Sequence, residues 1–411
     1  MRMSSLSFLS RGANRWSTLY PAVSTAEVYI KKMSDIYKES LEFHRKHHGK
    51  IAVTSKAPLS DREMLSLAYT PGVAEVSREI GKDATLAYEY TLKRNTVAVV
   101  SDGSSILGLG DLGAHAAIPV MEGKAAIFKE FAGIDAFPIC VNTQDTEEII
   151  ALVKNIAPCF GGINLEDISA PRCFEIEERL RAELSIPVMH DDQHGTATVV
   201  LAGLINALKL RGSRKERVRV VMSGAGAAGT AIAKILLAYG FGEVVVCDSK
   251  GAIYEGRADL NEEKMELARI TNRKKRAGIL AEVLSGADIF IGVSRGGLLT
   301  GEMVQMMAEQ PIIFALANPT PEIMPDVAYE AGAFIVATGR SDFPNQINNA
   351  LVFPGIFRGA LNNRVKQFAP AMFIRAAEAL ALYVRDPKTD QLLPPLFDKG
   401  IVAVVGDAIR E

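Results

Sequence analysis

The sequence of 411 residues predicts an α/β protein built on parallel sheets. The first observation is that short apolar runs alternate with longer helix-like segments, which is typical of strands joined by helices. The second is a pair of apolar runs, Cys159–Ile163 and Ile186–Met189, that each lead toward two neighbouring acidic residues. The third is a glycine-rich turn, Gly224–Gly229, between a strand-like and a helix-like segment. A chain of this length has room for two or three domains, and these patterns favour two.

The bulk composition is that of a water-soluble protein with a sizeable core. The chain is 48% hydrophobic and 23% charged, and its formal net charge of -2 gives no reason to expect nucleic acid or an anionic membrane as a partner. No apolar stretch approaches the roughly 18–20 residues that a membrane span needs. The four cysteines have no C-x-x-C spacing, which indicates reduced thiols and a reducing compartment.

Residues 1–33 are expected to form an extension ahead of the folded protein. Residues 1–26 contain no acidic residue, several serines and three arginines, a composition that resembles an organellar transit peptide. The alternative is a disordered extension, or upstream sequence translated ahead of a start at Met33. We prefer this alternative, which predicts a cytoplasmic protein. A transit peptide would instead predict a mitochondrion or a related organelle.

The elements of the first half follow in order from residue 34. We expect helices at 34–48, 62–69, 122–131, 145–156, 171–184 and 196–210, and strands at 96–100, 106–109, 136–141, 159–163 and 186–189. The histidines near residue 47 lie on a polar helix end, where solvated side chains are more common than metal ligands. Punctuation such as Thr70-Pro71-Gly72 separates the early helices.

A polar, basic segment, Arg211–Arg217, separates the two halves of the pattern. Beyond it we expect a helix at 227–239 and strands at 218–222, 244–247, 288–293, 312–316 and 334–337. We therefore assign residues 34–195 to a first α/β domain and residues 196–411 to a second.

The two acidic pairs predict a metal site. Glu166-Asp167 and Asp191-Asp192 follow two strands that are joined by one crossover helix, so the strands should be parallel neighbours. Both pairs then leave the carboxyl edge of the sheet, where ligand crevices lie. Carboxylates crowded there repel one another unless a cation lies between them, and such hard oxygen ligands suit Mg²⁺ or Mn²⁺. The alternative is two solvated helix N-termini, where acidic residues are favoured in any case.

The glycine-rich turn predicts a doubly wound, Rossmann-type dinucleotide-binding domain. The glycines of a G-x-G-x-x-G turn allow a tight bend and let the backbone approach a pyrophosphate at the helix N-terminus. The predicted contacts come from Gly224, Ala225, Gly226, Ala227, Ala228, Gly229 and Asp248. Asp248 ends the next strand, where it can accept hydrogen bonds from a ribose hydroxyl of NAD. The adjacent Ser249 and Lys250 could tolerate the 2′-phosphate of NADP, so both coenzymes stay open.

A dinucleotide beside a divalent metal suggests hydride transfer on a substrate that the metal chelates, such as a 2-hydroxy acid. Oxidation of the hydroxyl group then requires a base. Lys124 and His194 both lie near glycine-rich turns and are both candidates. Residue chemistry alone does not choose between them.

Eight motifs, in order along residues 35–365, resemble the malic enzymes, and most of all their short, bacterial-type branch. They are AYTPGVA at 68–74, SDGSSILGLGDLG at 101–113, PVMEGKA at 119–125, FGGINLEDI at 160–168, HDDQHGTA at 190–197, GAGAAG at 224–229, ALANPTPE at 315–322 and FPNQINNALVFPGIFRGAL at 343–361. The resemblance implies oxidative decarboxylation of (S)-malate to pyruvate and CO₂ with NAD or NADP and Mg²⁺ or Mn²⁺. It also implies a homodimer, with the helical N-terminus a candidate interface.

The resemblance assigns roles residue by residue. Tyr69 matches the general acid and Lys124 the substrate-contacting general base, while Asp191 supports the lysine or the metal. The metal ligands are Glu166, Asp167 and Asp192, and the substrate- or nicotinamide-contacting positions are Asn318 and Asn349. Larger members carry an arginine for a substrate carboxylate where this chain has Ser105, and this chain should lack their appended acyltransferase-like domain.

Two other functions compete with this reading. One is a malolactic-type enzyme that keeps NAD bound and converts malate to lactate. The other is a nucleotide- or metabolite-sensing module without catalysis, against which the presence of Tyr69, Lys124 and all three ligands speaks.

Overall fold

The computed structural model describes the backbone of residues 25–411 and side chains from residue 35 onward. The chain divides into two units, residues 1–52 and residues 53–411. The first contains helix α1 (Thr25–His47), which confirms the predicted helix at 34–48 and extends it toward the N-terminus. Of the predicted extension, residues 1–24 lie outside the described residues, and residues 25–33 form the start of α1.

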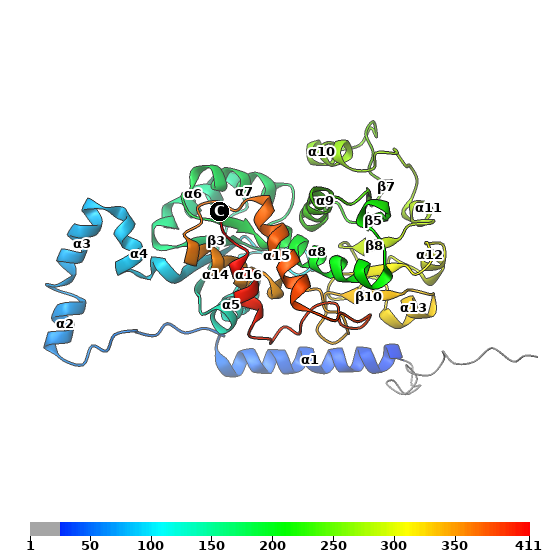
Figure 1. Ribbon diagram of the computed structural model, residues 1–411. Coiled ribbons are helices and arrows are strands. Elements are labelled where there is room, and N and C mark those ends of the chain that lie inside the picture. Colours follow the sequence, from blue (N-terminus) through cyan, green and yellow to red (C-terminus); the bar gives the residue numbers. More distant parts are fainter. Residues whose placement is uncertain (1–24) are drawn as a thin grey trace, which may run out of the picture. The chain divides into compact units, whose positions relative to one another are not determined.

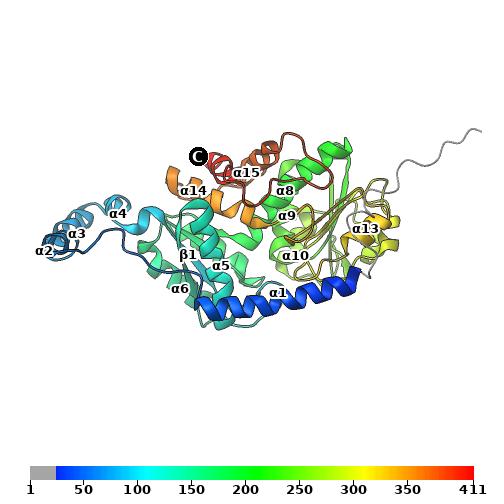
Figure 2. The ribbon, with the colours of Figure 1, turned by 90° about the horizontal axis from the view of Figure 1, so that it is seen from below.

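The second unit begins with a segment of short helices that buries none of its residues. These are α2 (Arg62–Ala68), α3 (Val73–Lys82) and α4 (Ala87–Tyr90). Figures 1 and 2 show α2 and α3 projecting away from the sheets of this unit.

The first sheet has the strand order β2-β1-β3-β4, and all its strands are parallel. Its elements are β1 (Thr96–Ser101), α5 (Ala114–Ala132), β2 (Asp135–Cys140), α6 (Thr146–Ile156), β3 (Gly162–Leu165), α7 (Arg172–Glu183) and β4 (Val188–His190). Alternate residues of β1 face two different hydrophobic clusters, one with α5 and the other with α6 and α7. The helices therefore cover both faces, and all the strands end at one common edge.

The predicted strand at 106–109 is wrong. Ile106 forms an isolated bridge with Gly110, and the chain between them turns back on itself. Leu107 and Gly108 have φ angles of 42° and 74°, and Leu107 is 53% exposed. Positive φ angles are incompatible with an extended strand, so the leucines of this run lie on a glycine-rich loop instead.

The second sheet has the order β10-β9-β8-β5-β6-β7, and only β7 is antiparallel to its neighbour. The strands are β5 (Arg219–Ser223), β6 (Glu243–Asp248), β7 (Gly251–Ala252), β8 (Ile289–Gly292), β9 (Ile312–Ala315) and β10 (Ile335–Thr338). The helices between them are α9 (Ala227–Tyr239), α10 (Glu262–Ile270), α11 (Leu280–Leu284), α12 (Gly301–Gln305) and α13 (Pro325–Glu330). Chain order reverses between β5 and β8, which confirms the doubly wound α/β class. In sheets of this class ligands bind at the carboxyl edge of the strands, at this point of reversal, and Gly224 directly follows β5.

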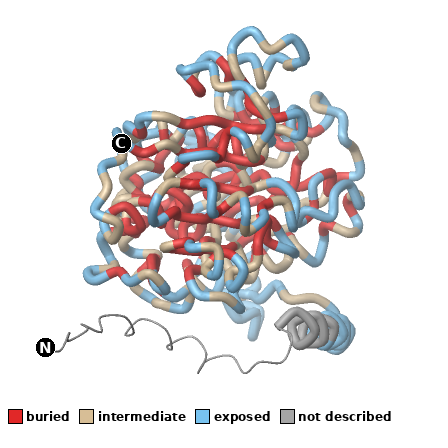
Figure 3. The backbone as a smooth tube through the Cα atoms, turned by 90° about the vertical axis from the view of Figure 1, so that its right-hand side faces the viewer, coloured by how far each residue is buried: buried red, intermediate tan, exposed pale blue. Residues whose placement is uncertain are grey.

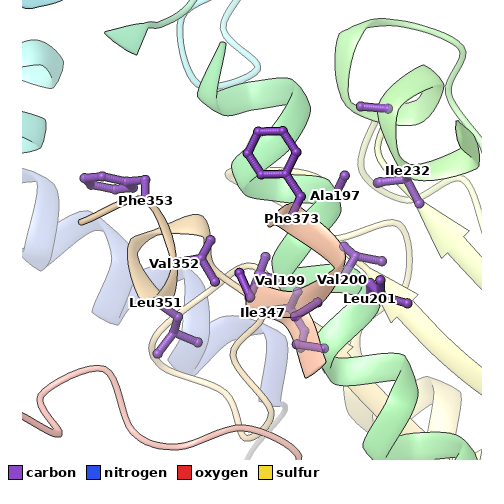
Figure 4. Close-up of a cluster of buried hydrophobic side chains, with 14 of the residues drawn as sticks. Ala197, Val199, Val200, Leu201, Ile232, Ile347, Leu351, Val352, Phe353 and Phe373 are labelled. Carbon is purple, nitrogen blue, oxygen red and sulfur yellow. The ribbon is translucent and has the colours of Figure 1, made fainter. Parts of the chain in front are cut away.

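Helix α8 (Asp191–Arg211) joins the two sheets. It packs against α9 and against α15 (Pro370–Tyr383), while α14 (Phe353–Asn363) packs on α16 (Ile401–Asp407). Figure 4 shows apolar side chains of α8 meeting Ile232 of α9 and Phe373 of α15, and Figure 3 shows the buried residues gathered in the interior. The predicted division after residue 195 falls inside α8 and stays a prediction.

Within residues 25–411, the structure contains no helix with the length and apolar character of a membrane span.

Candidate active site

A cluster of carboxylates lies at the carboxyl edge of the first sheet. Glu166 and Asp167 follow β3, and Asp192 lies in the first turn of α8, directly after β4. One oxygen atom from each of these three residues lies within 4.8 Å of the others. The structure thus brings together the three residues that the sequence suggested as metal ligands.

Local hydrogen bonds hold this cluster in place. The Asp167 backbone, at a φ of 54°, donates from its nitrogen to Asp192 Oδ2 at 2.9 Å. Asn164 Nδ2 donates to Glu166 Oε2 at 3.0 Å. Asp167 Oδ2 is buried and has no hydrogen-bond partner among the described residues. Because a buried charged oxygen without a partner is costly, this atom calls for a cation or a donor from a ligand.

Lys124 of α5 completes the cluster. Its ammonium group hydrogen-bonds to Asp191, lies 3.0 Å from Glu166 Oε1, and sits 4.2 Å from the centroid of the Phe353 ring. The residue is only 9% exposed. A Cβ atom at Gly195 would overlap Asp191 Oδ1, so the glycine one helical turn later leaves room for this carboxylate. Asp191 therefore contacts the lysine directly, and its predicted role in supporting the lysine or the metal stays a prediction.

Burial and charge crowding shift the ionisation of the cluster. Burial raises the pKa of Asp167 to about 8, with a further contribution from the charge of Asp192. Burial likewise raises the pKa of Glu166 well above its usual value. Burial lowers the pKa of Lys124, but the charges of Asp191 and Glu166 outweigh it and hold that pKa above the ordinary value. Four carboxylates around a single ammonium group leave excess negative charge, and this donor set fits a divalent cation.

His194, the alternative candidate base, faces away from this chemistry. Its Nε2 lies 3.1 Å from Glu177 Oε2, and its ring stacks on Phe373 with 4.7 Å between centroids. Glu177 also accepts hydrogen bonds from the backbone nitrogen of His190 and from Gln193 Nε2, both at 3.1 Å. Glu177 was not singled out from the sequence, although a buried acidic residue on an otherwise apolar helix face is the signal that could have found it.

Arg172 is a second residue that sequence reasoning missed. Its Nη2 lies 3.0 Å from Asp102 Oδ2 and donates to Ser104 Oγ at 3.0 Å. The Ser105 backbone nitrogen donates to the Asp167 carbonyl at 3.0 Å. These contacts tie the glycine-rich loop after β1 to the loop that carries the metal-ligand candidates.

The glycine-rich turn after β5 has the geometry that its sequence predicted. Gly224 has a φ of 118°, and a Cβ atom there would meet the Val293 carbonyl oxygen at 2.7 Å. A Cβ atom at Gly229 would overlap the Gly224 carbonyl oxygen. Only glycine fits both positions, and Gly226 caps the N-terminus of α9, the end that favours a phosphate group.

Asp248 lies at the end of β6, as predicted, and its carboxylate already accepts three hydrogen bonds from the protein. Oδ2 accepts hydrogen bonds from Arg257 Nη2 at 2.6 Å and from Lys264 Nζ at 2.7 Å, and Oδ1 accepts from the backbone nitrogen of Lys250 at 3.0 Å. Burial alone would raise the pKa of Asp248, but these donors lower it to about 2. The place where an adenosine ribose would lie is therefore lined by both an acid and several cations.

Of the two asparagine candidates, Asn349 lies near the first turns of α8 and Asn318 lies near the loop after β1. A Cβ atom at Gly195 would meet Asn349 Cβ at 3.3 Å, which sets Asn349 close to the Asp191 carboxylate. A Cβ atom at Gly108 would overlap the Asn318 carbonyl oxygen, so the segment after β9 contacts the loop after β1. Both positions join the second half of the chain to the first.

Tyr69 is the candidate that the structure leaves apart from the cluster. It follows α2, in the projecting segment, and is 66% exposed, whereas Lys124 and Glu166 are buried. Within this single chain, Figure 1 shows α2, which directly precedes Tyr69, apart from α5, the helix that contains Lys124.

A dinucleotide turn at one parallel sheet and a lysine among buried carboxylates at another define a coenzyme-dependent oxidoreductase. Residues 48–181 match the family model "Malic enzyme, N-terminal domain", and residues 193–404 match "Malic enzyme, NAD binding domain". The chain therefore belongs to the malic enzyme family, and its coenzyme is a nicotinamide dinucleotide.

Named relatives agree with this family. The chain is 55% identical to the bifunctional malic/malolactic enzyme of Bacillus subtilis, over 91% of this chain and 92% of that protein. It is also 55% identical to the NAD-dependent malic enzyme of Geobacillus stearothermophilus, over 88% of this chain and 76% of that protein. The crystal structure of an NAD-dependent malic enzyme from Thermotoga maritima is 52% identical, with a TM-score of 0.87, over 90% of this chain and 98% of that one.

Proposed function

We propose that this chain oxidatively decarboxylates (S)-malate to pyruvate and CO₂, with reduction of NAD⁺ or NADP⁺ and with Mg²⁺ or Mn²⁺ as cofactor. The observation that carries the proposal is the buried Lys124 ammonium group, which contacts Asp191 and Glu166 at the edge where the metal-ligand candidates converge. The free cysteines fit a reducing, cytoplasmic location.

Glu166, Asp167 and Asp192 would hold the metal ion. When bound, it supplies Lewis-acid stabilisation of negative charge on the C2 oxygen of malate. The carboxylates themselves fix the position and offset the charge of the ion, and the Asp167–Asp192 hydrogen bond keeps them in register. Asp167 Oδ2 is a ready ligand atom because nothing else satisfies it among the described residues.

Lys124 is the proposed base for the hydroxyl proton of malate. In the carboxylate cluster alone, its pKa is raised, which keeps it protonated. Base catalysis needs the neutral amine, so the negative charges of Glu166 and Asp191 must be offset when substrate binds. They would be offset by a divalent cation held by Glu166, Asp167 and Asp192. Asp191 holds the amine in position throughout, since its contact with Lys124 is independent of the three ligands.

The coenzyme would bind along the second sheet, with its pyrophosphate at Gly224–Gly229 and its adenosine ribose near Asp248. Asp248 can still accept one ribose hydroxyl through Oδ1, as NAD requires. Lys250 and Lys264 are cations that a 2′-phosphate could reach. Turnover rates measured side by side with NAD⁺ and NADP⁺ would show which coenzyme the site prefers.

Incubation of the purified protein with malate, Mn²⁺ and either coenzyme is expected to release free NADH or NADPH together with pyruvate. Absorbance of the reduced coenzyme and a pyruvate assay measure both products. The name of the Bacillus subtilis relative favours a second candidate, conversion of malate to lactate with retained NAD. Lactate without net coenzyme reduction would support that candidate, and no product with either coenzyme would contradict both.

The proposal includes a homodimer in which Tyr69 serves the active site of the second copy. The segment around Tyr69 exposes a group of apolar side chains, and large exposed apolar patches are rare on monomeric proteins. The group includes Leu65, Leu67, Tyr90 and Leu92, each at least 46% exposed. Tyr69 itself is too exposed to act in its own chain's buried cluster. A second copy that covers this segment would bury both the apolar surface and the tyrosine.

Mixing two inactive variants tests this arrangement. Tyr69→Phe and Lys124→Ala should each lower turnover by about 10²-fold or more, since each removes a proton-transfer group. After unfolding and refolding together in equal amounts, they should regain about a quarter of the wild-type rate, because half of random dimers are mixed and one of their two sites is complete.

The separate variants, refolded alone, are the controls for this experiment. If the mixture is no more active than its components, Tyr69 acts within its own chain or not at all. Sedimentation of the wild-type protein as a monomer at assay concentration would contradict the homodimer.

A further inference from the structure

A second polar pocket lies at the opposite edge of the first sheet from the carboxylates. It is a cavity of about 400 Å³ between the segment before β1 and the end of α14. Asn95 directly precedes β1, and a Cβ atom at Gly161, just before β3, would meet Leu361 Cδ2 at 2.5 Å. Because β1 has six residues at about 3.3 Å each, the two edges are about 20 Å apart. The pocket is therefore separate from the proposed malate site.

Positive charge dominates this pocket. Arg94, Arg358 and Arg364 line it, and Glu89 is the only carboxylate among its lining residues. In the described part of the chain, no ion pair within 4 Å joins these arginines to a carboxylate, although other arginines such as Arg179, Arg214 and Arg276 have one. A fourth cation, Lys93, lies beside the pocket with its ammonium group 5.1 Å from the ring centroid of Tyr88.

Two of these arginines, Arg358 and Arg364, contact neutral groups that hold them in place without neutralising their charge. Arg358 Nη1 donates to Asn95 Oδ1 at 2.7 Å, while its Nε is buried and has no hydrogen-bond partner among the described residues. The Arg364 guanidinium group lies 5.5 Å from the centroid of the Tyr88 ring. Burial lowers the pKa of Arg358, and the neighbouring charge of Arg94 lowers it further. Donors fixed by neutral groups and left with uncompensated charge are arranged to receive an anion.

We propose that this pocket binds a small oxyanion with two negative charges, a dicarboxylate or a phosphate compound. The guanidinium groups match both chemistries, since planar forks of N–H donors bind carboxylate and phosphate oxygens in pairs. Two negative charges balance the excess of three arginines over one glutamate. The volume is at the lower end of the range of small-molecule sites, which fits a small dianion.

Calorimetric titration of the full-length protein with succinate and, separately, with inorganic phosphate tests the proposal. The protein is freed of metal with EDTA, and the EDTA, itself a polycarboxylate, is removed before titration. The titrations contain neither coenzyme nor malate, with potassium chloride fixing the ionic strength, so they do not depend on the proposed catalytic function. At least one of the two anions should bind one site per chain. The double variant Arg94→Gln/Arg364→Gln should weaken that binding about tenfold or more.

The controls separate this site from general surface charge and from the active site. Arg214→Gln removes another exposed arginine, just before the second sheet, and this variant should bind the anion as the wild type does. Arg94→Gln and Arg364→Gln, made singly, serve if the double variant does not fold, and each should weaken binding measurably. Arg358 is left unchanged because its partner Asn95 also donates to the Gly133 carbonyl and to Asp135.

Three results would overturn the proposal. They are binding of neither anion to the wild type, equal binding to the pocket variants and the wild type, and an equal loss of binding in Arg214→Gln. Dissociation of a dimer in the pocket variants, without any anion binding in the wild type, would assign the arginines to a subunit interface instead.

Discussion

Lys124→Ala is expected to lower malate turnover by about 10²-fold or more, because it removes the proposed base. It should also destabilise the protein by about 3–5 kcal/mol, since Asp191 and Glu166 lose the cation between them in a buried setting. Steady-state kinetics and chemical denaturation measure the two effects separately. Both effects arise from a single contact network that pairs catalysis with stability.

Lys129→Ala is the matched control for this variant. Lys129 lies on the same helix and pairs with Asp135, but it is 57% exposed in its side chain. Its loss should change stability by less than about 1 kcal/mol and leave turnover unchanged. Near-normal turnover in folded Lys124→Ala would exclude Lys124 as the base and would return attention to other groups near Asp191.

Removal of divalent metal with EDTA is expected to abolish malate turnover, and addition of Mn²⁺ should restore it. Metal binding should also raise the free energy of unfolding by about 2.7 kcal/mol at a Mn²⁺ concentration 100 times the dissociation constant. The physical reason is that the ion relieves repulsion among Glu166, Asp167 and Asp192, which the folded chain holds together. Activity assays and thermal unfolding with and without Mn²⁺ measure both effects.

Asp167→Asn sharpens this test. The variant should lose both the activity and the stabilisation by Mn²⁺, because one ligand charge is gone. Without metal it should be at least as stable as the wild type, because its amide can donate to Asp192. The advantage should grow above about pH 8, where the buried carboxyl group of the wild type ionises and the amide stays neutral. Asp386→Asn, an exposed change elsewhere, should behave as the wild type. Full activity of the wild type in excess EDTA would mean that the carboxylates serve only as helix caps.

Much of the fold could be predicted because its strands are buried on both faces and therefore read as continuous apolar runs. Strands β1, β5, β8 and β9 lie within a residue or two of their predicted bounds. The error at 106–109 has a local cause, since leucines between glycines satisfy an apolar pattern while the backbone needs positive φ angles. Strand patterns report burial, and the leucines of this loop are exposed.

The site was predictable where residues follow adjacent strands and less so where contacts cross the chain. The topology alone brought Glu166, Asp167 and Asp192 to one edge. Residue chemistry alone left Lys124 and His194 open, and the family resemblance favoured Lys124. The contact that supports Lys124 joins residues 67 positions apart, and no local pattern reports which lysine reaches Asp191. The hydrogen bonds of Arg257 and Lys264 to Asp248 were invisible for the same reason, as was the separation of Tyr69 from the cluster.

Helix α8 has a consequence for how the enzyme can be divided. Its first turn carries Asp191 and Asp192, which belong to the edge of the first sheet. Its later turns bury apolar residues against α9 and α15, which both come from the second half of the sequence. A cut before this helix would leave the first fragment without Asp191 and Asp192. A cut after it would leave the second fragment without the helix on which α9 and α15 pack. The two sheets thus share one helix. A chimera with the coenzyme domain of another protein would have to retain the whole of α8 together with the surfaces on which it packs.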